Sequence, residues 1–178
     1  MNLWHDIKIG ENAPEEFNCI IEVPKGSHNK YEIDKETGLI KLDRANYGAA
    51  AYPFDYGFVP QTLWEDGDAL DVILLTTYPV HPGILVSARP VAIMEMTDSG
   101  ESDNKIIAVP VDDRRWDDVK ELSDLNKHML KEFKDFFENL KNLKGKPATV
   151  TIHDFKDKSE ALKAIEHSQK LYKDKFGK

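Results

Sequence analysis

Four carboxylates stand close together in the segment Glu65-Asp66-Gly67-Asp68-Ala69-Leu70-Asp71, directly before the apolar residues 72–75. Crowded acids repel one another, so the segment favours bound cations unless it is only a solvated acidic turn. Oxygen ligands suit Mg2+, Mn2+ or Ca2+, whereas the lack of neighbouring Cys and His opposes a Zn2+ site. An EF-hand loop would need a bidentate acid at its twelfth position, which here is Thr77. The segment therefore predicts a hard-metal site of another kind.

Other polar residues could serve the same site, although each has an ordinary structural alternative. Asp98 and Asp103 flank a turn before Lys105, and this pattern alone would be a plain hairpin tip. Lys30 and Glu32 share one face of a strand by the period of two, which a cross-strand ion pair would explain equally well.

Glu22 is the acid whose surroundings are least typical of a surface, because it lies inside the apolar run of residues 20–23. If it is buried and ionised, it must have a partner. Tyr52 and Tyr56 supply hydroxyls that could bind phosphate. Their loop, residues 51–60, could also be an aromatic plug over the end of a barrel.

The elements that must position these residues change in type along the chain. Up to Val111, short apolar or alternating runs separated by turn residues are typical of an antiparallel barrel or sandwich. Residues 45–61 mix glycine and proline with aromatic residues and predict a long structured loop. The predicted strands are residues 17–23, 30–34, 39–43, 71–76, 84–96, 105–111 and, after a helix, 147–155.

Beyond Asp112 the apolar period becomes 3.6, which predicts an amphipathic helix over residues 126–144, ended by Gly145 and Pro147. Asp157, followed three residues later by Glu160, resembles a capping box before a second helix over residues 159–176. Since repeats and linkers are lacking, residues 1–178 are predicted to form one domain. The pattern favours an α+β fold that is mainly β, with a five- or six-stranded barrel and two packed helices.

Composition and charge exclude several classes of function. A net charge of −8, from 32 acidic against 24 basic residues, opposes binding to nucleic acid or an anionic membrane. Any phosphate substrate would need bound cations. The single cysteine, Cys19, lies in an apolar run and is predicted to be a buried thiol. No stretch approaches the ~20 apolar residues of a membrane span, and the first ten residues do not resemble a signal peptide, so we expect a cytoplasmic protein.

Together these segments resemble the soluble family I inorganic pyrophosphatases over nearly the whole chain. The resemblance implies an OB-like five-stranded β-barrel with flanking C-terminal helices and Mg2+-dependent hydrolysis of pyrophosphate, with several Mg2+ ions per subunit and Mn2+ as an alternative. The short prokaryotic type of chain also implies a homohexamer. The most specific match is the run DGDALDV at residues 66–72, and the other matches lie at residues 21–24, 30–35, 42–44, 52–57, 96–98 and 103–110.

The resemblance also implies a role for each candidate residue. Asp68 would be the base that orients and deprotonates the attacking water. Asp66, Asp71 and Asp103 would bind two activating metals, with Asp71 as the bridge. Further roles would be metal binding with the substrate for Asp98 and Glu32, phosphate binding for Lys30, Arg44, Tyr56, Lys105 and Lys141, and support of the site for Glu22 and Tyr52.

Direct attack by water is the preferred route, because no Ser, Cys or His nucleophile arrangement is evident. The acidic segment also lacks the Asp-x-Asp-x-Thr pattern of an aspartyl-phosphate route. The main alternative from another class is an OB-type module for single-stranded nucleic acid or sugar, with the aromatic loop as a stacking platform. The net charge and the acidic cluster oppose that alternative.

Two positions depart from the family pattern. Ser99 stands where an acid often follows the residue matching Asp98, and Leu140 stands where a tyrosine commonly precedes the lysine matching Lys141. Leu140 lies on the apolar stripe of its helix and could simply pack there. We favour a place at the rim of the phosphate site, because Lys141 keeps its expected type. A pyrophosphatase-like scaffold without activity is the remaining alternative.

Overall fold

Five strands close into a ring, which is the centre of the fold. The computed structural model describes residues 1–146 and 149–177. Strand β1 pairs with both β4 and β6, and the path β4–β5–β8–β6 completes the circle. The β5–β8 pairing is parallel and the other pairings of the ring are antiparallel. These strands are β1 (Phe17–Val23), β4 (Asp55–Phe58), β5 (Asp71–Leu74), β6 (Leu85–Asp98) and β8 (Lys105–Pro110).

The ring confirms the predicted mainly β fold with a five-stranded, OB-like barrel. The long strand β6 pairs with β1 along residues 85–88 and with β8 along residues 88–94, and its register with β8 shifts between Pro90 and Ala92. Four further strands extend β6 or lie beside the ring. They are β9 (Val150–Asp157), which pairs with β6; the short β7 (Glu101–Ser102); and a separate antiparallel pair, β2 (Asn29–Ile33) with β3 (Ile40–Ala45).

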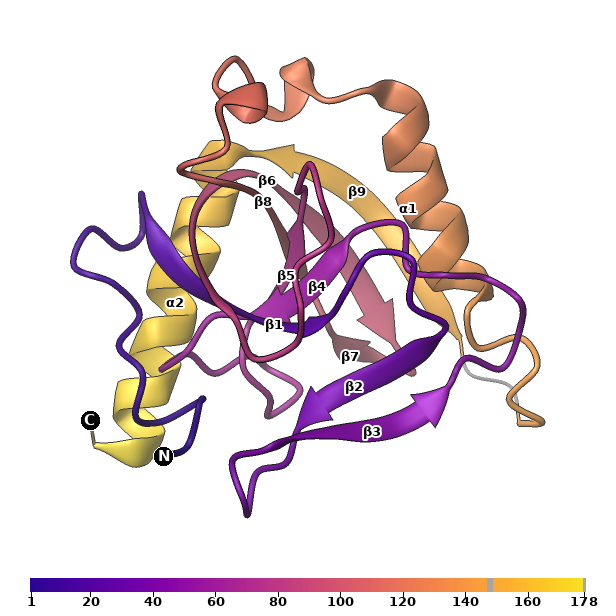
Figure 1. Ribbon diagram of the computed structural model, residues 1–178, viewed down its shortest axis with the longest axis horizontal. Coiled ribbons are helices and arrows are strands. Elements are labelled where there is room, and N and C mark those ends of the chain that lie inside the picture. The colour runs from indigo at the N-terminus through magenta and orange to yellow at the C-terminus, as the bar shows by residue number, and fades with distance from the viewer. Residues whose placement is uncertain (147–148, 178) are drawn as a thin grey trace.

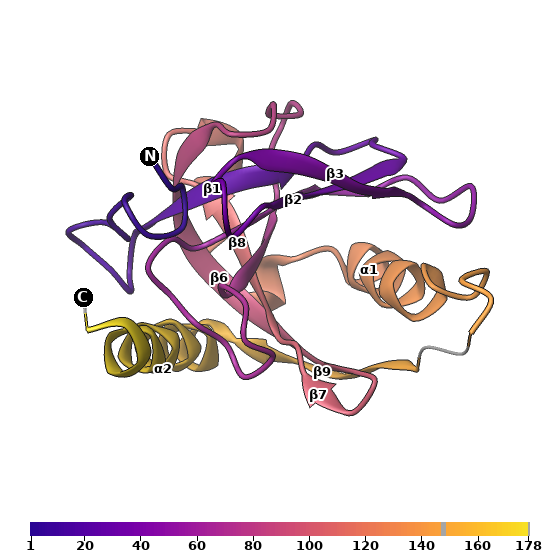
Figure 2. The ribbon, with the colours of Figure 1, turned by 90° about the horizontal axis from the view of Figure 1, so that it is seen from below.

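Two helices lie on different sides of the ring (Figure 1). Helix α1 (Lys127–Asn139) is capped at its N-terminus by Asn126, whose side chain accepts hydrogen bonds from the backbone N–H groups of His128 and Met129. It buries Phe133, Phe136 and Phe137. Seen from below, the β2–β3 hairpin projects over α1 (Figure 2). Two short 3-10 helices, at Arg114–Trp116 and Leu122–Asp124, were not predicted.

The aromatic loop packs against α1. Phe54 lies 4.9 Å from Phe133 and Tyr52 lies 4.9 Å from Phe136, between ring centroids. Phe54 is 1% exposed, and complete burial of such a side chain stabilises a fold by about 1.5–3 kcal/mol. Because Tyr52, Phe54 and Tyr56 are buried, these rings are not available to stack on bases.

Helix α2 (Lys158–Phe176) packs on the ring with Ala161, Ala164 and Ile165 and ends at Gly177, which has a left-handed backbone. The predicted capping box before α2 is wrong. Asp157 occupies the cap position, but within the described chain its side chain makes no capping hydrogen bond. The reason is that Asp157 still belongs to β9, where it pairs with Ala92, and its side chain is exposed.

Strand β4 lies inside the segment that was predicted to be a loop, so that prediction is wrong for residues 55–58. Its Gly57 hid the strand, because glycine in a short run ordinarily indicates a turn. Here the glycine is required by packing: a Cβ at this position would lie 2.0 Å from the carbonyl oxygen of Ile20 on β1. The close approach of β1 and β4 depends on it.

Most predicted boundaries agree with the structure within about two residues, which is ordinary for element ends. The first helix ends at Asn139, earlier than predicted, and Leu140 is its C-terminal cap. The predicted start of the last strand, Pro147, lies outside the described residues. Cys19 is a buried free thiol, as predicted. In the described part of the chain, no helix has the length and apolar character to span a membrane.

Candidate active site

A cavity of about 400 Å3 brings together most of the residues singled out from the sequence. A second cavity of about 350 Å3 adjoins it and shares Lys30, Tyr56, Asp68 and Asp71 with it. Glu22 and Glu32 line the second cavity. The predicted residues that line the first are Lys30, Arg44, Tyr52, Tyr56, Asp66, Asp68, Asp71, Asp98, Asp103, Lys105 and Lys141.

The acidic segment forms a tight turn between β4 and β5. The backbone N–H of Asp68 donates to Oδ1 of Asp66 at 3.1 Å, and Trp64 N–H donates to the carbonyl of Asp68 at 2.7 Å. Gly67 has φ of 85°, a conformation that suits glycine. The turn holds Asp66 and Asp68 at the cavity, while Asp71 follows as the first residue of β5.

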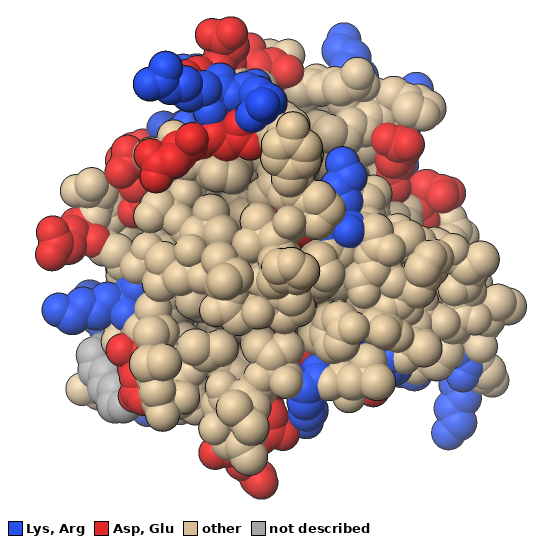
Figure 3. Space-filling model, in the orientation of Figure 1, with Lys and Arg blue, Asp and Glu red and all other residues tan. Residues whose placement is uncertain are grey.

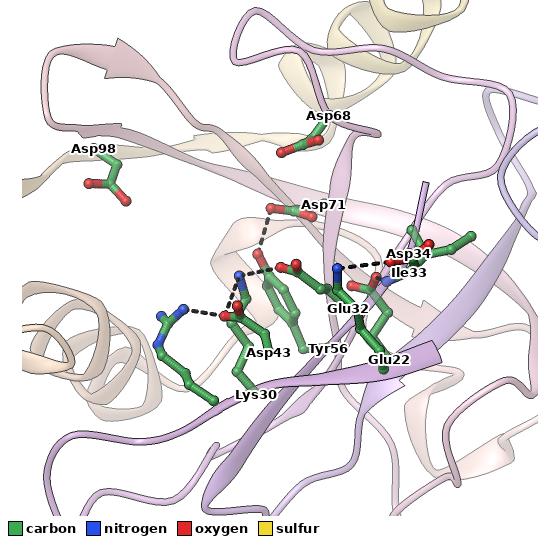
Figure 4. Close-up of polar contacts among 12 residues, drawn as sticks. Glu22, Lys30, Glu32, Ile33, Asp34, Asp43, Tyr56, Asp68, Asp71 and Asp98 are labelled. Atoms are coloured by element: carbon green, nitrogen blue, oxygen red, sulfur yellow. Dashed lines mark hydrogen bonds and ion pairs between the residues drawn. The ribbon is translucent and has the colours of Figure 1, made fainter. Parts of the chain in front are cut away.

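Lys105 is the buried cation of the site, with a side chain 2% exposed. It is the parallel-strand neighbour of Asp71, and its Nζ lies 2.6 Å from Oδ2 of Asp71 and also contacts Asp103. Tyr56 donates its hydroxyl to the same Asp71 oxygen at 2.5 Å (Figure 4). One ammonium therefore serves two carboxylates, and the nearby Asp66 adds further negative charge.

This excess of negative charge appears in the pKa values. Burial, and then the charge of Asp71, raise the pKa of Asp103 from 3.8 to about 7. Burial also raises the pKa of Asp66, with a contribution from Asp71. Burial and the neighbouring acids raise the pKa of the Tyr56 hydroxyl well above its usual value. A hard cation at this place would relieve the repulsion.

The donor set fits a hard divalent cation in its chemistry, because the acids offer only oxygen ligands. Among the residues that the structure describes, no three His, Cys, Asp or Glu side chains converge as a metal-binding group. Instead, Lys105 contacts Asp71 and Asp103, and Lys141 contacts Asp98. Lys35 contacts Asp68. Cation binding to Asp71, Asp103 and Asp98 would require Lys105 and Lys141 to move away from these carboxylates.

The predicted phosphate-binding residues lie around the acids. Lys30 contacts Glu32 at 3.2 Å and Asp43 at 3.6 Å, and Arg44 also contacts Asp43 (Figure 4). Nε of Arg44 is buried and has no hydrogen-bond partner within the described residues. A buried donor without a partner costs free energy, so it is a natural place for an anionic ligand.

Asp43 was missed as a site residue by the sequence analysis. It lies between Lys30 and Arg44 and orients both of them. Its place beside Arg44, within the matched residues 42–44, was the available signal.

Glu22 has the partner that its burial demanded. Glu22 is only 6% exposed, and its Oε1 accepts a hydrogen bond from Ile33 N–H at 2.7 Å. Burial, and then the charge of Asp71, raise the pKa of Glu22 from 4.5 to about 8. The bond joins β1 to β2, so Glu22 ties the hairpin that carries Lys30 and Glu32 to the ring.

Leu140 and Ser99, the two departures from the family pattern, both line the first cavity. Leu140 is 9% exposed and also belongs to the apolar cluster with Phe136 and Phe137. Leu140 therefore packs in the core and also reaches the cavity wall that Lys141 lines, and its place at the rim of a phosphate site stays a prediction. The Ser99 hydroxyl donates to Oδ1 of Asp98 at 3.0 Å.

Comparison with known proteins decides the family. The family model described as inorganic pyrophosphatase matches residues 19–173. The chain belongs to the inorganic pyrophosphatase family. This pyrophosphatase-family chain is 45% identical to "Soluble inorganic pyrophosphatase" of Oryza sativa subsp. indica over 169 residues, covering 95% of this chain and 78% of the relative. It is 44% identical to "Inorganic pyrophosphatase" of Haloferax volcanii, covering 99% of each chain.

Solved structures agree with the family assignment. The crystal structure of the inorganic pyrophosphatase from Thermus thermophilus superposes with a TM-score of 0.92 at 41% identity, covering 97% of this chain and 99% of that one. The inorganic pyrophosphatase from Helicobacter pylori gives 0.89 at 39% identity, covering 94% and 99%.

Proposed function

We propose that this member of the inorganic pyrophosphatase family hydrolyses pyrophosphate to two phosphates by direct attack of water, with Mg2+ as its cofactor. The observation that carries the proposal is a single cavity in which clustered carboxylates face lysine and arginine side chains. Pyrophosphate carries several negative charges, and its hydrolysis moves charge onto the leaving phosphate. A site for this reaction needs cations on both sides of the bond that breaks.

We assign metal binding to Asp66, Asp71 and Asp103, with further metal contacts from Asp98 and Glu32. Bound Mg2+ would neutralise phosphate charge and lower the pKa of a bound water. Mn2+ offers the same preference for oxygen ligands and is proposed as an alternative.

Asp68 is the proposed base. It lines the cavity beside Asp66 and Asp71, and its exposed side chain can be reached by a water molecule. Its task is to hold the attacking water in line and accept a proton from it.

The substrate oxygens would be bound by the cations around the cavity. Arg44 can donate its unpartnered Nε, while Lys30 and Lys141 offer ammonium groups at the cavity wall. Lys105 and Tyr56 donate to Asp71 in the structure and are proposed to donate to phosphate once that acid has another cation. Tyr52 and Glu22 support these residues through packing and through the link between β1 and β2.

The direct test is phosphate release from pyrophosphate by the purified protein, with Mg2+, with Mn2+ and with EDTA. We expect release with either metal and none with EDTA, because unneutralised acids at the cavity repel the anionic substrate. The absence of activity with both metals between pH 6 and 9 would refute the proposal.

The assembly is proposed to be a homohexamer. This rests on the resemblance to short prokaryotic chains, and it agrees with a face whose centre shows few charged side chains (Figure 3). Tyr78, Ile84 and Leu85 are large apolar residues with exposures of 71%, 49% and 45%. Light scattering should give about six times the 20.3 kDa of one chain; a monomer at micromolar concentration would contradict the proposal.

A cytoplasmic location remains a prediction.

A further inference from the structure

Lys35 makes a contact whose purpose is not explained by stability. It lies just after β2, and its Nζ forms an ion pair with Oδ1 of Asp68. Both side chains are more than half exposed, at 57% and 55%. An exposed pair of this kind contributes little to folding, typically about 0–1 kcal/mol. What the pair does affect is the direction in which the Asp68 carboxylate points.

Lys35 approaches Asp68 from the second cavity. Asp68 lines both cavities, whereas Lys35 lines only the second of the two. The lysine is therefore placed to act on the carboxylate without occupying the substrate cavity. With Oδ1 engaged, the other carboxylate oxygen remains available for a water in the first cavity.

A platform restrains Lys35. Its Nζ lies 5.8 Å from the centroid of the Trp4 ring, a cation–π distance. Trp4 is 4% exposed and is fixed by its Nε1–H, which donates to the carbonyl of Thr62 at 2.8 Å, and by Gln61 N–H, which donates to the Trp4 carbonyl at 2.9 Å. An aromatic platform held at two points limits the motion of a flexible lysine.

We propose that Lys35 is a positioning residue, which orients the Asp68 carboxylate for its water and is itself held over Trp4. The proposal rests on the role proposed above for Asp68. Catalysis by a base depends steeply on orientation, so a lysine that fixes one oxygen raises the rate of the chemical step. It should have little effect on the binding of substrate, because it does not line the first cavity.

The test compares Lys35→Met with two other variants. Lys41→Met is the matched control, because Lys41 lines the same second cavity but pairs with Asp34 at 2.9 Å. We expect Lys35→Met to lower kcat about tenfold, with KM changed less than about twofold. Lys35→Arg should restore most of the loss. Lys41→Met should leave kcat unchanged, which separates orientation from the loss of one positive charge.

A double-mutant cycle shows whether Lys35 acts through Asp68. In an Asp68→Asn background, Lys35→Met should cause no further loss of kcat. Unfolding midpoints in EDTA should agree within about 2 °C between wild type and Lys35→Met, as expected for an exposed pair.

Three results would overturn the inference: a Lys35→Met enzyme with wild-type kcat, a rise in KM alone, or an equal loss of kcat in the Asp68→Asn background. A different result, wild-type kcat in Asp68→Asn itself, would refute the base assignment on which the inference rests.

Discussion

Replacing Glu22 by glutamine tests the electrostatics beneath the cavity. Glutamine keeps the size of the side chain and an oxygen that can accept the hydrogen bond from Ile33 N–H, so the link between β1 and β2 is retained. What it removes is the ability to ionise. The charged groups that act on Glu22 are Asp71, Lys30 and Glu32, with Asp71 the strongest.

The direction in which Glu22 changes the stability with pH follows from the direction of its pKa shift. The folded chain holds a proton on Glu22 up to about pH 8, while an ordinary carboxyl loses it near 4.5. The raised pKa therefore contributes stability that is present below pH 4.5 and is lost as the pH rises to 8. Above that range, the folded protein must carry a buried carboxylate.

The size of this contribution to the free energy of unfolding follows from the same pKa shift. At about 1.36 kcal/mol per pKa unit, moving from 4.5 to 8 corresponds to about 5 kcal/mol. Because Glu22 lines the second cavity, solvent that enters it would hydrate the ionised form and lower this cost, so we expect about 2–3 kcal/mol. For a chain of this size that is a difference of roughly 5–10 °C in Tm.

The assay is thermal unfolding in EDTA at pH 5 and pH 9. The difference in unfolding temperature between Glu22→Gln and the wild type should be small at pH 5, where Glu22 of the folded chain is protonated, and the variant should unfold at the higher temperature at pH 9. Glu36→Gln is the control, since Glu36 lines the same cavity but is exposed. Groups such as Asp103 titrate in both proteins, so only the difference between them is read. Equal midpoints at pH 9, or a less stable variant there, would refute the reasoning.

The remaining predictions concern the reaction. Asp68→Asn should lower kcat by roughly 10²-fold or more with Mg2+ affinity retained in calorimetry, whereas Asp71→Asn should weaken Mg2+ affinity; indistinguishable titrations would contradict the assignment. Leu140→Tyr should lower KM for pyrophosphate several-fold, because a hydrogen bond to a charged group contributes about 1.5–3 kcal/mol. An unchanged KM with a lower Tm, from overpacking of about 1–3 kcal/mol, would show that Leu140 only packs.

The sequence predicted the fold best where periodicity was strong. A continuous apolar run located β1, and the 3.6-residue stripe located α1 by the phenylalanines that it buries. Strand β4 was not predictable in this way, because the need for Gly57 arises from Ile20, which is distant in sequence. The false capping box at Asp157 has a similar origin, since pairing with β6 determines the conformation there.

The candidate site could be predicted as a set of residues but not as a set of partners. Residue types and spacing brought Asp66, Asp68 and Asp71 into one prediction, and the cavity contains all three. Asp43 contacts the distant Lys30 and its neighbour Arg44, and the second contact depends on how far the arginine side chain reaches. The contact of Lys35 with Asp68 also joins separate parts of the chain. Composition and period carry no information about such contacts.

The contacts in the cavity bear on how metal and substrate depend on each other. Lys105 contacts Asp71 and Asp103, and Lys141 contacts Asp98, so cations of the proposed phosphate site neutralise acids of the proposed metal site. A divalent cation on these acids weakens their attraction for the lysines, which then have charge to offer to an anion. Conversely, pyrophosphate attracts the lysines away from the acids. We therefore expect the two kinds of ligand to favour each other's binding through groups that the chain already pairs.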